Sequence, residues 1–174
     1  MGTSYGNELS FTTNPAITAT LTTTVVSSIT PVAAVSGGNI TDDGDATITA
    51  RGICWATTSS PTIGDNLTSN GTGKGSYTSN ITGLQPSTVY YVRAYATNSA
   101  GTAYGNDLTF TTIAVVPSVT TAEVSAITQT TATSGGNVTS NGGSSVTARG
   151  VCWGTSTNPT VANSHTSNGT GDGI

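Results

Sequence analysis

The chain has 174 residues, enough for one large or two small domains, and only 7% of them are charged. Ordinary soluble domains carry roughly 25% charged residues, and here Thr, Ser, Asn and Gly take their place. The formal net charge is −4 and there are four Lys and Arg residues in all. Nucleic acid and anionic membrane surfaces are therefore excluded as expected partners, because both are bound through clustered positive charge. No apolar run reaches about eighteen residues, so membrane insertion is not expected.

Seven short strand candidates with turn signals between them occupy residues 14–112, and no segment has the 3.6-residue apolar period of a helix. In chain order, the expected strands are residues 17–24, 33–40, 47–56, a short one near 66–69, 76–82, 89–97 and 103–112. Residues 113–117 are expected to link this segment to the next. Such a series of short strands is typical of a β-sandwich.

The sixth expected strand alternates between an apolar face and a face that is polar and aromatic. Successive side chains of a strand point to opposite faces, so one face is expected to enter the core. The outward face would carry Tyr91, Arg93 and Tyr95. Alternation along the chain predicts these inward residues: Tyr77, Ile81, Leu84, Tyr90, Val92, Leu108 and Phe110.

The stretch from Leu84 to Gly101, LQPSTVYYVRAYATNSAG, resembles the sixth strand of a fibronectin type III domain. In that family a Leu-x-Pro-x-Thr corner leads into Tyr-x-Val-x-Ala-x-Ala-x-Asn and closes at a Gly, and all of these positions match here. The resemblance implies an all-β, immunoglobulin-like (fibronectin type III-like) β-sandwich.

The second expected strand departs from this family, because Gly37 and Gly38 stand where a large aromatic residue is usual. Trp55 shares a face with the apolar residue two positions before it, so we expect Trp55 to point inward and fill the vacated space. Two alternatives stay open. Trp55 points outward beside Tyr91 and Tyr95, or the glycines mark a bulge or a close backbone approach.

The sequence repeats itself at a spacing of about one hundred residues. Residues 36–73 and 134–171 align without a gap at an offset of 98, and residues 5–13 match residues 104–112 at an offset of 99. Such repetition is typical of tandem domains. The expected organisation is residues 1–13 as the last strand of a preceding repeat, residues 14–112 as a complete fibronectin type III-like domain, and residues 113–174 as the early strands of a following repeat.

No catalytic or cofactor-binding constellation is expected, and the chain is predicted not to be an enzyme. The one histidine, His165, aligns with Leu67 in the preceding copy, so the repeat lacks a common general base. Cys54 and Cys152 hold equivalent places in successive copies, too far apart for a disulfide if the copies fold separately. A buried apolar role is expected for such cysteines, and no second Cys or His stands at metal-ligand spacing.

Asp42, Asp43 and Asp45 share one four-residue turn, where carboxylates would offer calcium the oxygen ligands it prefers. The turn lacks the spacing of a calcium loop, and the next copy has Ser140, Asn141 and Gly143 in place of the three carboxylates. A solvated turn without metal is therefore the expectation, and a calcium site is the alternative.

The outward row of Tyr91, Arg93 and Tyr95 is the candidate ligand or interface surface. Aromatic rings beside an Arg bind sugars or peptides through stacking and cation–π contacts. The alternative is structural, because such residues also form cross-strand pairs that stabilise a sheet.

The motif Ala-Arg-Gly-x-Cys-Trp, followed by YYVRAYATNSAGTAYGN, resembles tandem repeats of large secreted bacterial surface proteins and adhesins. The resemblance implies an extracellular, secreted or cell-surface location and a structural role as a stalk or fibre body. The expected partners are neighbouring repeats or copies of the chain itself in a fibre, joined by strand addition. The alternative function is a carbohydrate- or protein-binding accessory module of a secreted enzyme, with a glycan or surface protein as its ligand.

Overall fold

The computed structural model describes every residue from Met1 to Ile174. The regular elements of the chain are all strands, and it has no helix long and apolar enough to cross a membrane. We call residues 14–112 the first unit. Its strands are β1 (Thr20–Ser27), β2 (Ala33–Asp42), β3 (Ala50–Ala56), β4 (Asn66–Leu67), β5 (Gly75–Thr82), β6 (Val89–Asn98), β7 (Gly101–Tyr104) and β8 (Leu108–Thr111).

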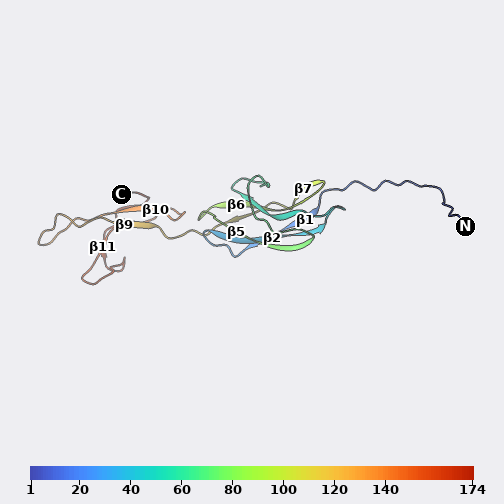
Figure 1. The fold of residues 1–174 in the computed structure, drawn as a ribbon. Coiled ribbons are helices and arrows are strands. Elements are labelled where there is room, and N and C mark those ends of the chain that lie inside the picture. Colours follow the sequence, from blue (N-terminus) through green and yellow to red (C-terminus); the bar gives the residue numbers. More distant parts are fainter.

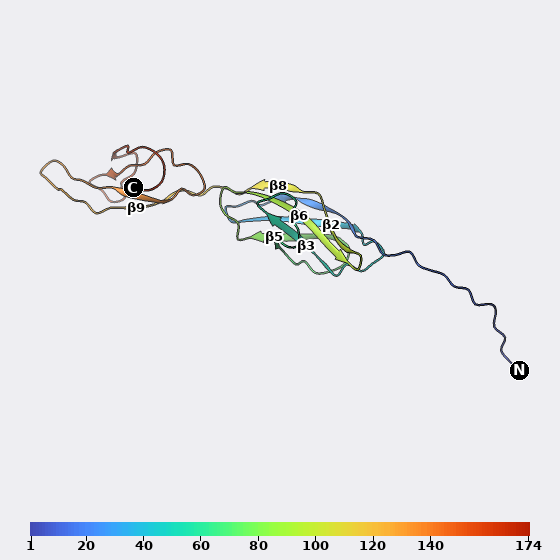
Figure 2. The same cartoon turned by 90° about the horizontal axis from the view of Figure 1, so that it is seen from above.

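These strands form two antiparallel sheets that pack face to face (Figures 1 and 2). One sheet has the order β1-β2-β5, and the other has the order β4-β3-β6-β7, with β8 also pairing β6. An immunoglobulin-like sandwich likewise places its first, second and fifth strands in one sheet and its third, sixth and seventh in the other. The predicted class, an all-β, immunoglobulin-like (fibronectin type III-like) sandwich, is confirmed.

The last expected strand, residues 103–112, is divided into β7 and β8, and this division corrects the prediction. Between the two strands, Gly105 comes so close to β1 that a Cβ on it would lie 2.7 Å from the Thr23 nitrogen. Asn106 then accepts a hydrogen bond from that nitrogen at 3.0 Å. The chain therefore bends away from β6 to reach the edge strand of the opposite sheet.

The core between the sheets contains fourteen buried apolar residues. Five of the seven residues predicted to point inward belong to it, while Tyr77 and Leu108 are half-buried and pack against it. Trp55 is 9% exposed and lies in the core, so the inward orientation is confirmed. Ile40 and Ile48, which were not among the predicted residues, are 2% and 1% exposed.

Tyr77 occupies the space above Gly38, its pairing partner on the neighbouring strand. A Cβ on Gly38 would lie 2.6 Å from Tyr77 Oη and 2.7 Å from the Ala94 Cβ. The Tyr77 hydroxyl reaches across the sandwich and donates to the Gly52 carbonyl at 2.7 Å. Gly38 therefore marks a close approach, and Tyr77 on the fifth strand supplies the aromatic ring that the second strand lacks.

We call residues 113–174 the second unit. Its strands are β9 (Ser118–Thr121), β10 (Gly136–Ser140), β11 (Cys152–Trp153) and β12 (Ser164–His165). β9 and β12 begin 98 residues after β1 and β4, and the pairs β9–β10 and β11–β12 reproduce β1–β2 and β3–β4. Trp153 is 52% exposed, in contrast to Trp55. Repetition of the complete fold stays a prediction.

The first and second units lie end to end, and residues 1–13 extend from the far end of the first unit (Figures 1 and 2). This segment forms no strand. Its apolar side chains Tyr5, Leu9 and Phe11 are 88%, 89% and 88% exposed. The chain thus enters the first unit at one end and leaves it at the other.

Candidate functional site

The row of Tyr91, Arg93 and Tyr95 is not the continuous exposed surface that alternation predicts. Tyr95 is 4% exposed and its hydroxyl donates to the Thr68 carbonyl at 2.8 Å. Burial removes this phenol from water and raises its pKa. Only Tyr91 and Arg93 reach solvent, and both are half-buried.

Arg93 is engaged with the strand next to it. Its guanidinium carbon lies 4.7 Å from the centre of the Tyr104 ring, and its Nε donates to the Gly105 carbonyl at 3.0 Å. These contacts hold the charge over an aromatic face and use one of its donors. Arg93 therefore secures the end of β7, as the structural alternative for this row requires.

The loop between β3 and β4 is anchored on the outer face of this sheet by Tyr104 and Asp107. Ser60 N donates to the Asp107 carboxylate at 2.7 Å, and Ile63 N donates to the Tyr104 hydroxyl at 3.1 Å. Pro61, between these two anchors, is fully buried. The loop therefore covers part of the face on which sequence reasoning placed a ligand, while Tyr91 and Arg93 stay half-buried.

Sequence reasoning missed Tyr104 and Asp107 as functional positions of this face. Both belong to the segment Tyr104–Thr112, which matches residues 5–13 with the acidic character kept at the position of Asp107. That repetition was the signal in the sequence that could have pointed to Tyr104 and Asp107. It marks the two residues that anchor the loop, whereas alternation within β6 does not.

Cys54 lies beneath this loop. Its thiol donates to the Pro61 carbonyl at 3.3 Å, and its side chain is inaccessible to water. Burial raises the pKa of the thiol to about 11, against the smaller opposing effect of Arg93. Cys54 and Cys152 are both free, and Cys152 is half-buried. The thiol of Cys54 acts as a buried packing group.

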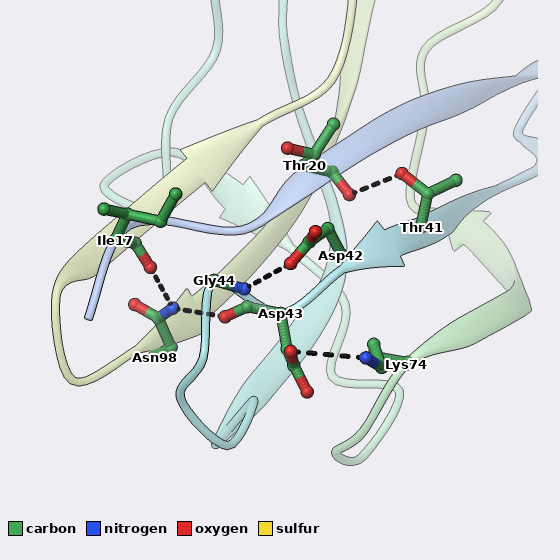
Figure 3. Close-up of polar contacts among 8 residues, drawn as sticks. All are labelled: Ile17, Thr20, Thr41, Asp42, Asp43, Gly44, Lys74 and Asn98. Atoms are coloured by element: carbon green, nitrogen blue, oxygen red, sulfur yellow. Dashed lines mark hydrogen bonds and ion pairs between the residues drawn. The ribbon is translucent and has the colours of Figure 1, made fainter. Parts of the chain in front are cut away.

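In the acidic turn after β2, Asp42 and Asp43 contact different partners and not a common point (Figure 3). Asp42 accepts a hydrogen bond from Gly44 N at 2.7 Å, and Asp43 pairs with Lys74 at 3.3 Å. Asp45 is exposed. The structure brings no group of three or more His, Cys, Asp or Glu side chains into a metal-binding arrangement. The calcium alternative therefore has no assembled ligand set at Asp42, Asp43 and Asp45.

Asn98 fastens this turn to the start of the domain. Its amide nitrogen donates to the Ile17 and Asp43 carbonyls, both at 2.7 Å (Figure 3). Its oxygen accepts from Ala100 N and Gly101 N at 2.9 and 3.2 Å. Asn98 is 5% exposed, and its side-chain amide donates two hydrogen bonds and accepts two, which is its full capacity. One side chain thus joins the chain entry, the acidic turn and the end of β6.

Arg51, from the repeated Arg-Gly-x-Cys-Trp motif, fixes a long polar loop. Its guanidinium donates to the carbonyls of Asn70, Gly73 and Lys74 at 3.2, 2.9 and 2.9 Å. It also stacks over the Tyr77 ring at 5.0 Å. Arg149 makes similar contacts in the second unit, but one residue further along, to the carbonyls of Asp172 and Gly173. The motif is thereby explained as a structural clasp.

Comparison with protein family models found no match, and comparison with curated protein sequences found none either. Among solved structures, the chain is similar to the sensor domain of the anti-sigma factor RsgI4 of Pseudobacteroides cellulosolvens. The TM-score is 0.41 at 15% identity, over 56% of this chain and 96% of that one. It is also similar to a fibronectin type III domain of human fibronectin type III domain containing protein 3. Here the TM-score is 0.34 at 16% identity, over 60% of this chain and 92% of that one.

Proposed function

We propose that the chain is a non-catalytic, extracellular structural repeat, part of the stalk or fibre body of a bacterial surface adhesin or filament. The observation that carries this proposal is the end-to-end arrangement of the two units (Figures 1 and 2). The chain enters the first unit at one end and leaves it at the other, so a series of units built like the first would gain length with every unit. Length with fixed shape is what a stalk supplies.

The contact between β1 and the bend before β8 suits the first unit to bearing load. Tension applied to the two ends of the unit pulls on β1 and β8, which belong to different sheets. Thr23 joins them, because its nitrogen donates to Asn106 Oδ1 at 3.0 Å and its hydroxyl donates to the Asn106 carbonyl at 2.6 Å. Ala94 N also donates to the Thr23 hydroxyl at 3.0 Å. Separating the ends requires these bonds to break together.

The exposed segment 5–13 supports the partner that we propose, a neighbouring repeat or another copy of the chain. Seven of its nine residues are identical to those of residues 104–112. In the first unit, Phe110 of that stretch stacks on Tyr90 at 5.8 Å, and Leu108 packs against the core. Residues 5–13 carry the same side chains with the same spacing. They fit the last-strand position of another unit, by strand addition.

Single-molecule force spectroscopy on the full chain tests this proposal. We expect the first unit to unfold in one cooperative event that releases roughly 3.3 to 3.6 Å of chain per residue. Asn106→Ala removes the acceptor of Thr23 N and should lower the unfolding force. Asn80→Ala, which changes an exposed residue of β5, is the matched control. Extension of the wild-type chain without a force peak would contradict the stalk function.

A further inference from the structure

The connection between the two units is short and is fixed on both sides. Ile113 N donates to the Thr30 carbonyl of the first unit at 3.4 Å, and Val115 N donates to the Gly142 carbonyl of the second unit at 2.8 Å. One residue, Ala114, lies between these fixed points. Any change in the angle between the units must therefore be taken up close to Ala114.

The units also touch beside this connection, at the corner before β6. A Cβ on Gly143 would lie 2.7 Å from the Ser87 Cβ and 3.0 Å from the Pro86 carbonyl oxygen. Cβ atoms in proteins essentially never lie as close as 2.7 Å to another heavy atom, so a side chain at position 143 would have to displace its neighbours. The absence of a side chain at Gly143 is what allows the second unit to sit this close to the first.

The turn itself does not require glycine at this position. Gly143 corresponds to Asp45 in the first unit, at the offset of 98 residues. Asp45 has a φ of 58° and Gly143 a φ of 85°, so the same turn accepts an aspartate with its backbone in the left-handed region. Asp45 is exposed, as is Gly143, so neither turn is buried within its own unit. The requirement for glycine at 143 therefore comes from the contact with Pro86 and Ser87.

We propose that the Pro86–Ser87 corner and the Asn141–Gly143 turn form a docking contact whose partner is the next β unit of the same chain. Gly143 sets the fit of this contact and stops rotation about Ala114. The inference rests on the proposed stalk function and deepens it, because a stalk transmits direction only when its units keep a fixed angle. A larger side chain on either side of the contact holds the units apart and frees the joint.

Residual dipolar couplings measured on the full chain test the docking contact. In the wild-type chain, the amides of β1–β8 and of β9–β12 should fit one common alignment tensor. Gly143→Asp introduces the residue that the first unit carries at this turn, and it should abolish the common tensor. Asp45→Gly, at the equivalent turn away from the joint, is the control and should leave the common tensor unchanged.

A second variant probes the contact from the first unit. Ser87 has a φ of 50°, which asparagine tolerates well, so Ser87→Asn adds bulk without new backbone strain. It too should abolish the common tensor, and it serves as the test if Gly143→Asp disturbs the second unit. Two independent tensors in the wild-type chain, or a common tensor retained in Ser87→Asn, would overturn the proposal. The unfolding force of the first unit should stay unchanged in Gly143→Asp, so failure of the joint and failure of the stalk function are distinguishable.

Discussion

At the scale of single residues, the interior of the first unit depends on a glycine, Gly38, that lies opposite a large side chain, Tyr77. Gly38 leaves room for Tyr77, whose ring lies under Arg51 and whose hydroxyl reaches Gly52 on the other sheet. Burial of this ring raises the pKa of the phenol, against the smaller opposing effect of Arg51. One side chain thus connects the two sheets and supports the clasp of the polar loop.

Gly38→Ala tests this pairing. The added methyl group meets both Tyr77 Oη and the Ala94 Cβ within 2.7 Å, so we expect a loss of about 1 to 3 kcal/mol in the free energy of unfolding. Gly135→Ala is the control, because a Cβ there has no neighbour within 4 Å and should cost little. Urea unfolding followed by circular dichroism gives both values. Equal stability of the two variants would show that Tyr77 moves aside without cost.

At the scale of elements, the parts that sequence reasoning predicted well are those with local signals. The alternation and flanking turns of residues 84–101 define β6, and its inward face is in the core as expected. The parts that it missed depend on distant partners. Ser60 and Asp107 are 47 residues apart in the chain, and Ile63 and Tyr104 are 41 apart. The burial of Tyr95 could not be predicted either, because the carbonyl that its hydroxyl contacts, that of Thr68, lies 27 residues away in the chain.

The last strand shows the same limit. Its apolar alternation predicts one strand, but Gly105 and Asn106 turn toward Thr23, which is more than eighty residues away in the chain. The glycine was visible in the sequence as a place for a bend. The strand that it bends toward was not, because no local pattern identifies the edge of the opposite sheet.

Arg51→Ala tests the clasp as an element of structure. The substitution leaves the carbonyls of Asn70, Gly73 and Lys74 without their charged donor, so residues 70–75 should exchange their amide hydrogens faster. Hydrogen bonds to charged groups contribute about 1.5 to 3 kcal/mol each to stability, after exchange with water is counted. Hydrogen exchange with mass spectrometry measures the effect, with Arg93→Ala as a control that should leave this loop protected. Unchanged exchange at residues 70–75 in Arg51→Ala would refute the clasp.

At the scale of the whole molecule, the first unit should lose stability in alkaline solution. Cys54, Tyr77 and Tyr95 all have raised pKa values because they are buried. The folded state therefore keeps protons that the unfolded chain has released, so the free energy of unfolding falls as pH rises. For Cys54 the fall begins near the unfolded value of 9.0 and continues to about 11, at up to about 1.4 kcal/mol per pH unit.

Denaturant unfolding between neutral pH and pH 11 measures this dependence. Cys54→Ala should move the start of the decline upward, toward the unfolded tyrosine value of 10.0. The same variant should match the wild-type slope near neutral pH, where all three groups are protonated in both states. A wild-type stability that stays level above the unfolded thiol value of 9.0 would contradict the burial of these protons.

The four bonds of Asn98 also govern when the first unit can close during synthesis. Its partner Ile17 precedes it by 81 positions, and its partner Asp43 by 55. A nascent polypeptide cannot complete this corner until nearly the entire unit has emerged, and such distant pairings make folding slow compared with that of helical domains. The corner therefore cannot form before Gly101 has left the ribosome, and until then the start of the unit lacks the side chain that holds it to the acidic turn.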